Sequence, residues 1–281
     1  MNHYKIVASD LDGTLLNSKS AISDENNKAI ETLYNMGVNF VPCTGRSYSE
    51  LPDELKQNPN IRYYILSNGA MVYDKFLNDK ILTCISNQLL KNIINIINDY
   101  DVHIVFRMNG KLLADAAQCD DASYDFYNVC DDHRHVVSNY ATFPDNFADA
   151  LKNGDNIEEV SIFFRDVEKL TECQKRLLKY EELNIVHGVV NNLEIFSKYA
   201  GKGNALLKLA DELGVDHSDT ISMGDSENDI SSIKSAGLGL AVKNACDGLK
   251  QAADKIICSN DEHAVEYVLK NFFNNNTKER V

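Results

Sequence analysis

Short apolar runs that end in polar turns recur along the first third of the chain. Three of them occupy residues 4–9, 39–43 and 63–66. Such runs, followed at once by polar or glycine-containing turns, are typical of buried strands. Between the first two, Ser23 precedes residues with apolar positions at helical spacing, and Gly37 ends them, which predicts an N-capped helix. Strands that alternate with helices predict a parallel sheet with crossover helices.

The pattern changes after about residue 82 and returns near residue 200. The middle of the chain combines helical spacing at 89–97 and 167–180 with strand-like runs at 102–108, 160–164 and 185–190. The alternation then resumes with helices over 205–213 and 230–236 and strands over 220–223, 238–242 and 255–258. We therefore expect an α/β domain formed by residues 1–83 and 191–281, with an α+β domain inserted at residues 84–190.

Composition and charge narrow the function classes. The chain has 281 residues, which suits two domains, and its 28 basic and 42 acidic side chains give a net charge of −14. Such a charge repels nucleic acid and anionic lipid, so neither partner is expected. No apolar run reaches the length of a membrane span or a secretory signal, and the seven cysteines form no Cys-x-x-Cys pair. We expect a cytoplasmic protein with reduced thiols, as a monomer or small homo-oligomer.

Polar side chains follow four of the predicted strands. They are Asp10 and Asp12, then Thr44, then Asn68, and then Asp225 with Asp229 just beyond it. The carboxyl ends of parallel strands meet at one edge of a sheet, where ligands bind, so these side chains predict a single site. Several carboxylates, a backbone carbonyl and water form the oxygen-only environment that Mg²⁺ prefers.

These residues resemble the motifs of a known family. Asp10-Leu11-Asp12-Gly13-Thr14, Thr44, Lys202 and Gly224-Asp225-Ser226-Glu227-Asn228-Asp229 match, in order, the four motifs of the haloacid dehalogenase (HAD) superfamily of phosphohydrolases. Thr44-Gly45-Arg46, Ser67-Asn68-Gly69-Ala70, Lys202-Gly203 with Ala205-Leu206, and Asn244-Ala245 are similar to its Cof-type branch, subfamily IIB. The resemblance covers essentially the whole chain and implies a Rossmann-like parallel-sheet core with an inserted α+β cap domain of type C2B.

The resemblance also implies a role for each motif residue. Asp10 would be the nucleophile, and Asp12 the general acid and base whose carbonyl also ligates the metal. Thr44 and Lys202 would hold the phosphoryl group and offset its charge. Asp10, Asp12, Asp225 and Asp229 would form the Mg²⁺ site. The substrate-binding set would be Thr44, Gly45, Arg46, Asn68, Lys202 and Asn228.

Several of these positions have a second interpretation. Asp229 could cap the helix that follows it, and Lys198 competes with Lys202 as the active-site cation. Arg46 and Asn68 could anchor loops instead of contacting substrate. Ser231-Ser232 depart from the larger apolar residue that the family usually places there, which concerns helix packing more than chemistry.

A second cluster of possible metal ligands lies in the polar middle of the chain. Cys119, Cys130, His133 and His135 suggest zinc, but their spacing fits no common structural site. The neighbouring aromatic residues Tyr124, Phe126 and Tyr127 are expected to pack within the inserted domain, with a smaller chance that they face the substrate.

The function expected from these features is a Mg²⁺-dependent phosphatase that acts on small phosphate monoesters, such as sugar phosphates or phosphorylated cofactors, through an aspartyl phosphate. A phosphomutase or a dedicated sugar-phosphate phosphatase is the nearest alternative. A non-catalytic binder of phosphorylated ligands or a receiver-type signalling module is more remote, since a receiver needs about half this length and no inserted domain.

Overall fold

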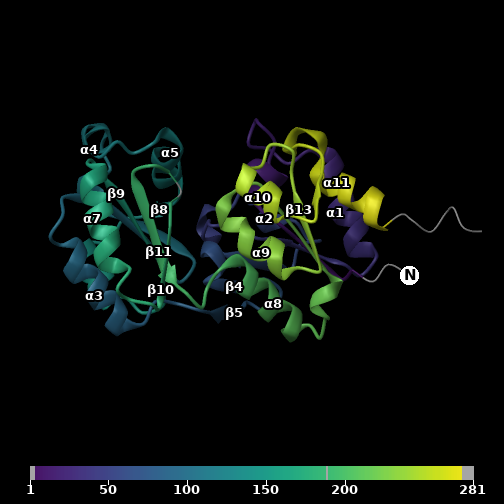
Figure 1. Cartoon of the computed structure of the whole chain (residues 1–281), viewed down its shortest axis with the longest axis horizontal. Helices are drawn as coiled ribbons and strands as arrows, with labels where there is room; N and C mark the ends of the chain where they lie inside the picture. The colour runs from purple at the N-terminus through teal and green to yellow at the C-terminus, as the bar shows by residue number, and fades with distance from the viewer. Residues whose placement is uncertain (1–3, 188, 274–281) are drawn as a thin grey trace, which may run out of the picture. The chain divides into compact units, whose positions relative to one another are not determined.

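The computed structural model describes residues 4–187 and 189–273 and divides into two units (Figure 1). The first unit is formed by Met1–Gly45, Pro52–Ile81 and Gly201–Val281, and the second by Arg46–Leu51 and Leu82–Ala200. The second unit is thus an insertion in the first. In the part of the chain described, every helix is too short or too polar to cross a membrane.

A five-stranded parallel sheet forms the centre of the first unit, with the strand order β14-β13-β12-β1-β2. A bridge between Cys43 and Ile65 adds β3 beside β2, and β3 continues into an antiparallel hairpin with β4 and β5. The strands are β1 (Ile6–Ser9), β2 (Asn39–Pro42), β3 (Tyr63–Leu66), β4 (Met71–Asp74), β5 (Asp79–Leu82), β12 (Thr220–Gly224), β13 (Leu238–Ala241) and β14 (Lys255–Ile256).

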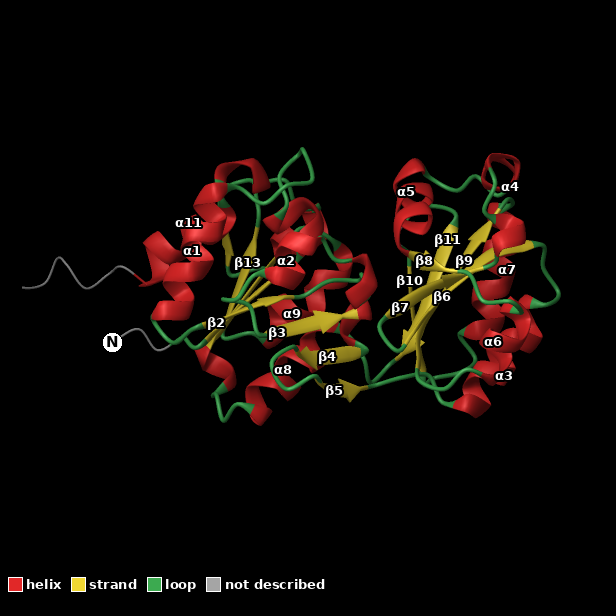
Figure 2. Cartoon of the chain, turned by 180° about the vertical axis from the view of Figure 1, so that it is seen from behind, coloured by secondary structure: helices red, strands yellow, loops and turns green. Residues whose placement is uncertain are grey.

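Amphipathic helices cover this sheet (Figure 2). Helix α8 buries Ala205, Leu206 and Leu209 against a core that includes Ile6 and Val41 of the strands. Helices α1 and α11 lie side by side, tied by a hydrogen bond from the Val265 amide to Asn26 Oδ1 (3.0 Å). The helices are α1 (Asp24–Asn35), α2 (Asp53–Gln57), α8 (Lys202–Glu212), α9 (Ile230–Ser235), α10 (Asp247–Ala252) and α11 (Ala264–Val268).

The second unit is built on a six-stranded sheet with the order β10-β11-β9-β6-β7-β8. All neighbouring strands in it are antiparallel except β7 and β8. The strands are β6 (Val102–Met108), β7 (Lys111–Ala114), β8 (Ala141–Thr142), β9 (Ile157–Phe164), β10 (Leu183–Val186) and β11 (Asn192–Ser197). Because β6 and β9 alternate their side chains, apolar residues reach both faces of the sheet.

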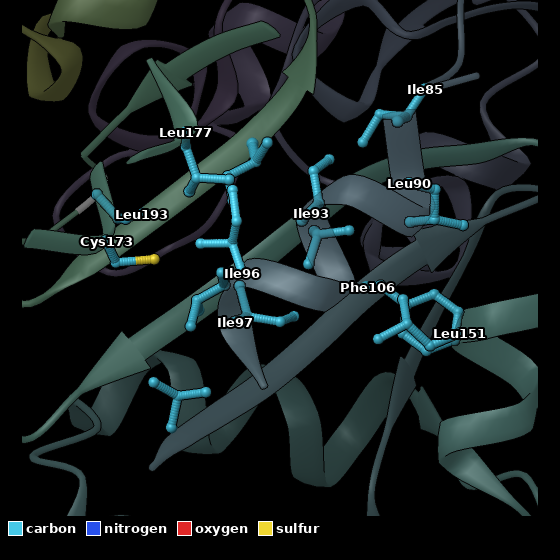
Figure 3. Close-up of a cluster of buried hydrophobic side chains, with 14 of the residues drawn as sticks. Ile85, Leu90, Ile93, Ile96, Ile97, Phe106, Leu151, Cys173, Leu177 and Leu193 are labelled. Carbon is cyan, nitrogen blue, oxygen red and sulfur yellow. The ribbon is translucent and has the colours of Figure 1, made fainter. Parts of the chain in front are cut away.

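Helices cover both faces of this sheet. On one face α3 and α7 enclose an apolar core in which Ile93 and Ile97 meet Phe106 and Leu177 (Figure 3). On the other face, α4 and α5 cover a smaller core around Val105. The helices are α3 (Asn87–Ile97), α4 (Asp121–Phe126), α5 (Asp131–Tyr140), α6 (Phe147–Asn153) and α7 (Val167–Leu177). The fold class predicted from the sequence, a parallel-sheet domain carrying an inserted α+β domain, is confirmed.

Three details of the sequence prediction were wrong. The border at residue 191 fell too early, because β11 pairs with β9 and β10 in the second sheet. Arg46–Leu51 was assigned to the first unit but belongs to the second. The segment between residues 119 and 135, where the sequence pattern predicts no helix, contains α4 and the start of α5.

Two histidines pack at the smaller core of the second unit, His103 fully buried and His133 partly buried. The ring of His103 is fully buried and lies edge-on to Tyr124, Phe163 and His133. Burial lowers the pKa of His103 to about 4. Burial, with added repulsion from His103 and Arg107, lowers the pKa of His133 to about 3. Both rings are therefore neutral in the folded protein.

This pair predicts loss of stability in mild acid. Below pH ~6.5 these histidines become protonated in the unfolded chain but stay neutral in the folded chain. The free energy of unfolding therefore has its full value above pH ~6.5 and decreases as the pH falls toward 4. At pH 5, each histidine lowers the free energy of unfolding by up to about 2 kcal/mol. We expect His103→Phe to reduce the fall in melting temperature between pH 7.5 and pH 5. His135→Gln, an exposed neighbour on α5, is the control, and equal pH dependence in the two variants would refute the prediction.

Candidate active site

Asp10 ends β1, and the chain turns sharply after it. Its amide donates to the Met223 carbonyl on the neighbouring β12 (2.9 Å), and its side chain is only 6% exposed. Gly13 makes the turn with φ +77°, a conformation that side chains with a Cβ rarely adopt. A Cβ at Gly13 would also collide with the Asp225 carboxylate, so glycine is needed here for space as well as for conformation.

Asp225 and Asp229 follow β12 in a single tight turn. Asp229 Oδ2 accepts hydrogen bonds from the amides of Asp225 and Ser226, both at 3.1 Å. A Cβ at Gly224 would collide with Asp229, so this glycine lets the carboxylate lie against the end of the strand. As the N-cap residue of α9, Asp229 makes no side-chain hydrogen bond to that helix, so the capping interpretation was wrong. Its Oδ2 closes the turn before the helix instead, and its Oδ1 accepts from the active-site lysine.

Lys202 joins the two carboxylate segments. It is the first residue of α8, its side chain is 1% exposed, and Nζ lies 2.7 Å from Asp10 Oδ1 and 2.6 Å from Asp229 Oδ1. Lys198, the competing candidate, is exposed, with its ammonium over the ring of Tyr199. The structure therefore places Lys202, and not Lys198, in the carboxylate cluster.

Thr44 and Asn68 come from the two strands beyond β1. Thr44 is buried, its amide donates to the Ile65 carbonyl (2.9 Å), and its own carbonyl accepts from the Asn68 amide (3.1 Å). Asn68 has φ +51°, and its side-chain oxygen accepts from Asn228 Nδ2 (3.1 Å). Gly45 lies against the same Asn68 amide group. Thr44, Asn68 and Asn228 thus form one hydrogen-bonded set within the first unit, and Gly45 packs against it.

Asp12 differs from these residues in the exposure of its side chain, and Arg46 differs in the unit to which it belongs. The Asp12 side chain is exposed and is not one of the three clustered carboxylates, although its predicted metal ligand is the main-chain carbonyl. Arg46 belongs to the second unit, where Nη1 donates to the Glu50 carbonyl (3.1 Å). The loop-anchoring interpretation of Arg46 is therefore part of its role.

The buried cluster of Asp10, Asp225, Asp229 and Lys202 carries more negative than positive charge. Burial raises the pKa of Asp10 well above its usual value, and Lys202 offsets this only in part. Burial, followed by repulsion from Asp229, raises the pKa of Asp225 to about 6. Burial alone would lower the pKa of Lys202, but attraction to Asp10 and Asp229 overcomes it and raises that pKa. Three carboxylates and one ammonium leave a formal charge of −2 when all are ionised.

The donor set fits a divalent cation. Among the described residues, the carboxylate oxygens of Asp10, Asp225 and Asp229 form a group in which one oxygen of each lies within 4.8 Å of the others. Asp225 Oδ1 is buried without a hydrogen-bond partner, and a buried unpaired carboxylate oxygen is costly. Oxygen donors with a formal charge of −2 match Mg²⁺ in both ligand type and charge.

The possible zinc ligands belong to the second unit, whereas the carboxylate cluster belongs to the first. His133 packs its ring against Phe163 with 4.3 Å between ring centroids, while His135 is exposed. Cys119 and Cys130 are partly buried. Of the three aromatic residues expected to pack here, Tyr124 and Tyr127 are buried, whereas Phe126 is 41% exposed.

Two residues outside the predicted set of site residues support the geometry of the site. Asn244 donates to the Gly13 carbonyl (2.8 Å) and accepts from the Asn260 amide (3.0 Å), so it braces the turn after Asp10. Ser231, which departs from the family pattern, accepts from the Gly203 amide (3.2 Å) and so links α9 to the first turn of α8. Asn244 could have been inferred from its place after β13, but the role of Ser231 depends on helix packing.

Comparison with known proteins supports this assembly. The family model for haloacid dehalogenase-like hydrolases matches residues 7–269. The 5-amino-6-(5-phospho-D-ribitylamino)uracil phosphatase YcsE of Bacillus subtilis is 32% identical over 273 residues, covering 95% of each chain. Phosphatase YwpJ of the same bacterium is 30% identical over 284 residues, covering 95% of this chain and 99% of YwpJ. The structure of a HAD subclass IIB sugar phosphatase aligns with a TM-score of 0.79 at 21% identity, covering 95% of this chain and 98% of that one.

The fold, the motifs and these matches define a phosphohydrolase, and the chain belongs to the haloacid dehalogenase-like hydrolases. It is an enzyme, and its activity is that of a phosphatase.

Proposed function

We propose that this phosphatase is Mg²⁺-dependent and hydrolyses small phosphate monoesters through an aspartyl phosphate on Asp10. The observation that carries the proposal is the position of Lys202, whose ammonium lies between the carboxylates of Asp10 and Asp229, which form one cluster with Asp225. A buried carboxylate next to an ammonium can approach an anionic phosphoryl group, because the lysine offsets the repulsion between the two.

Each residue has a distinct task in the proposed reaction. The Asp10 carboxylate attacks phosphorus and expels the alcohol, and Asp12 gives the leaving oxygen its proton. Asp12 then takes a proton from the water that attacks the aspartyl phosphate, which releases inorganic phosphate and restores Asp10. The Thr44 hydroxyl and Lys202 hold the phosphoryl oxygens through both steps. The exposure of Asp12 suits this task, because a general acid and base must reach both substrate and solvent.

Some of the predicted metal-binding residues would ligate Mg²⁺, and others would hold those ligands in place. Asp10, Asp225 and the Asp12 carbonyl would ligate Mg²⁺ directly, while Asp229, both of whose oxygens already accept hydrogen bonds, would fix the geometry around it. When bound, Mg²⁺ would act as a Lewis acid that neutralises charge on the phosphoryl oxygens.

Small substrates are favoured over phosphoproteins. The inserted α+β unit of residues 82–200 would act as a cap, which admits metabolites and excludes large chains. Relatives YcsE and YwtE carry the name of a phosphatase for a phosphorylated ribitylamino-uracil. We infer that the substrates are sugar phosphates or phosphorylated cofactor precursors of that size. We further propose a cytoplasmic enzyme, active as a monomer or small homo-oligomer, without nucleic-acid or membrane partners.

A phosphomutase is the alternative with the same residues. A mutase returns the phosphoryl group to its substrate and depends on a bisphosphate, whereas a phosphatase releases inorganic phosphate without one. Steady release of phosphate from p-nitrophenyl phosphate in the absence of any bisphosphate would support hydrolysis, and release only after a bisphosphate is added would support the mutase.

Metal removal tests the proposed dependence on Mg²⁺. We expect EDTA to reduce phosphate release from p-nitrophenyl phosphate by at least about 100-fold, and excess Mg²⁺ to restore it. Mg²⁺ should also raise the melting temperature, because a ligand that binds only the folded state stabilises it. Asp225→Asn should lose that rise, whereas Asp53→Asn, at an exposed position, should keep it. Full activity in EDTA would contradict the proposal.

A further inference from the structure

Asp12, the proposed general acid and base, lies in an irregular turn of the first unit. The turn spans residues 11–16 and is called the Asp12 turn below. A hydrogen bond from the Leu16 amide to the Leu11 carbonyl (2.8 Å) closes it. Inside the turn, the backbone of Asp12 (φ −76°, ψ 118°) and of Gly13 (φ +77°) is not helical. Because the Asp12 side chain is exposed, the position of its carboxyl group depends on this backbone more than on packing.

Two asparagines from the C-terminal part of the chain hold this turn. Asn244 Nδ2 donates to the Gly13 carbonyl (2.8 Å), and Asn260 Nδ2 donates to the Leu16 carbonyl (3.0 Å). The Asn260 amide also donates to Asn244 Oδ1 (3.0 Å), which joins the two residues. Asn244 and Asn260 are called the asparagine brace below. The brace thus holds the Asp12 turn at the residue after Asp12 and at the residue that closes the turn.

The brace also connects the Asp12 turn with the carboxylate cluster. Asn244 lies in the loop after β13, and this loop is hydrogen-bonded to the neighbouring β12 on both sides of Asn244. The Val242 amide donates to the carbonyl of the last residue of β12 (3.1 Å), and the Cys246 amide donates to the Asp225 carbonyl (2.8 Å). Asn244 therefore fixes the Asp12 turn relative to the main chain of Asp225, a member of the cluster.

The exposure of the brace indicates a role in position more than in stability. Asn244 is exposed, and Asn260 is partly buried. Water can replace the hydrogen bonds of such side chains, so these bonds add little to the free energy of unfolding. Catalysis is more sensitive to position, because misplacing a catalytic group by about 1 Å can lower the rate about 100-fold. The largest effect of the brace is therefore expected on the position of the Asp12 carboxyl group.

We propose that Asn244 and Asn260 are positioning residues for proton transfer by Asp12. In the step concerned, a bond forms between an Asp10 oxygen and phosphorus, and the bond from phosphorus to the leaving oxygen breaks. The proton of the Asp12 carboxyl group passes to that leaving oxygen. The brace keeps Asp12 within reach of it by holding two carbonyls of the turn. The inference rests on the proposed function and deepens it, because it names the residues that place the general acid.

The test compares two substrates that differ in their need for a proton. The p-nitrophenolate anion is stable and leaves with little help, whereas phenolate is a stronger base and gains more from a general acid. With saturating Mg²⁺, we expect Asn244→Ala and Asn260→Ala to lower kcat/KM for phenyl phosphate by about 10–100-fold. For p-nitrophenyl phosphate we expect a loss of less than about threefold. The measured quantity is kcat/KM because it includes departure of the alcohol and excludes later hydrolysis of the aspartyl phosphate.

Asn191→Ala is the matched control. Asn191 Nδ2 donates to carbonyls of the second unit that are distant in sequence, those of Tyr127 (3.0 Å), Asn128 (3.2 Å) and Phe164 (3.1 Å). This variant should change kcat/KM for the two substrates by the same factor, within about twofold. The brace variants should lose no more than about 4 °C in melting temperature. An equal loss of kcat/KM for both substrates in the brace variants would overturn the inference, because damage to the fold does not distinguish leaving groups.

Asp12→Ala separates this inference from the proposed function. This variant should lower kcat/KM for phenyl phosphate by at least about 100-fold more than for p-nitrophenyl phosphate. Adding Asn260→Ala to it should lower kcat/KM by less than about a further twofold, because Asn260 acts through Asp12. A selective loss in Asp12→Ala without one in the brace variants would refute the inference alone. Equal losses for the two substrates in Asp12→Ala would refute the proposed role of Asp12, and the inference with it.

Discussion

Asp10→Asn is expected to lower phosphate release from p-nitrophenyl phosphate by at least about 10⁴-fold while the fold survives. The amide cannot serve as the nucleophile, and Asp229 cannot replace it, because both of its oxygens accept hydrogen bonds from Lys202 and from two backbone amides. A purified variant assayed with saturating Mg²⁺ gives the measurement.

The melting temperature of Asp10→Asn shows whether a loss of activity comes from the lost nucleophile or from a damaged fold. Burial raises the pKa of Asp10, and its neighbours Asp229 and Asp225 add repulsion, so the ionised side chain is held at a cost. Replacing it with a neutral amide removes this repulsion, while Lys202 keeps Asp229 as its partner. We expect the melting temperature to stay the same or rise. Asp53→Asn, at an exposed position of the same unit, should alter neither activity nor melting temperature. Activity that survives in Asp10→Asn would exclude Asp10 as the nucleophile.

The parts of the site that the sequence could predict are those determined locally. Asp10, Thr44, Asn68 and Asp225 each follow a strand of recognisable pattern, and parallel strands bring their carboxyl ends together whatever the intervening loops do. The choice of Lys202 over Lys198 came from the residues that follow it, and the structure gives the reason. Lys202 begins a helix and its side chain is buried, whereas Lys198 lies in an exposed turn.

The parts that the sequence could not predict depend on distant partners. Glu50 and Arg107 of the second unit form a buried ion pair although they are 57 residues apart, and no local pattern marks either residue as buried. The assignment of Arg46 to the second unit follows from that pair and was missed with it. Helices α4 and α5 were missed for a related reason. Their segment is rich in aspartate, and few of its residues, among them Tyr124 and Val137, reach the smaller core.

Lys202→Met is expected to have the second large effect, on activity and stability together. The substitution keeps most of the buried side-chain volume but removes the ammonium from between Asp10 and Asp229. Leaving buried carboxylates without their cation costs about 3–5 kcal/mol, and loss of a charge that stabilises the transition state lowers kcat by about 10²–10³-fold. Lys198→Met, four residues earlier and exposed, is the matched control and should change neither quantity.

The response of Lys202→Met to Mg²⁺ then tests whether charge is what the cluster lacks. In the variant, the clustered carboxylates of Asp10, Asp225 and Asp229 have lost the cation that bridges Asp10 and Asp229, so a divalent ion should stabilise the folded state more than it stabilises the wild type. We therefore expect a larger Mg²⁺-induced rise in melting temperature in Lys202→Met, without recovery of kcat, because the metal does not take the place of Nζ. A variant with wild-type kcat, or one that Mg²⁺ does not stabilise, would show that Lys202 does not balance the charge of these carboxylates.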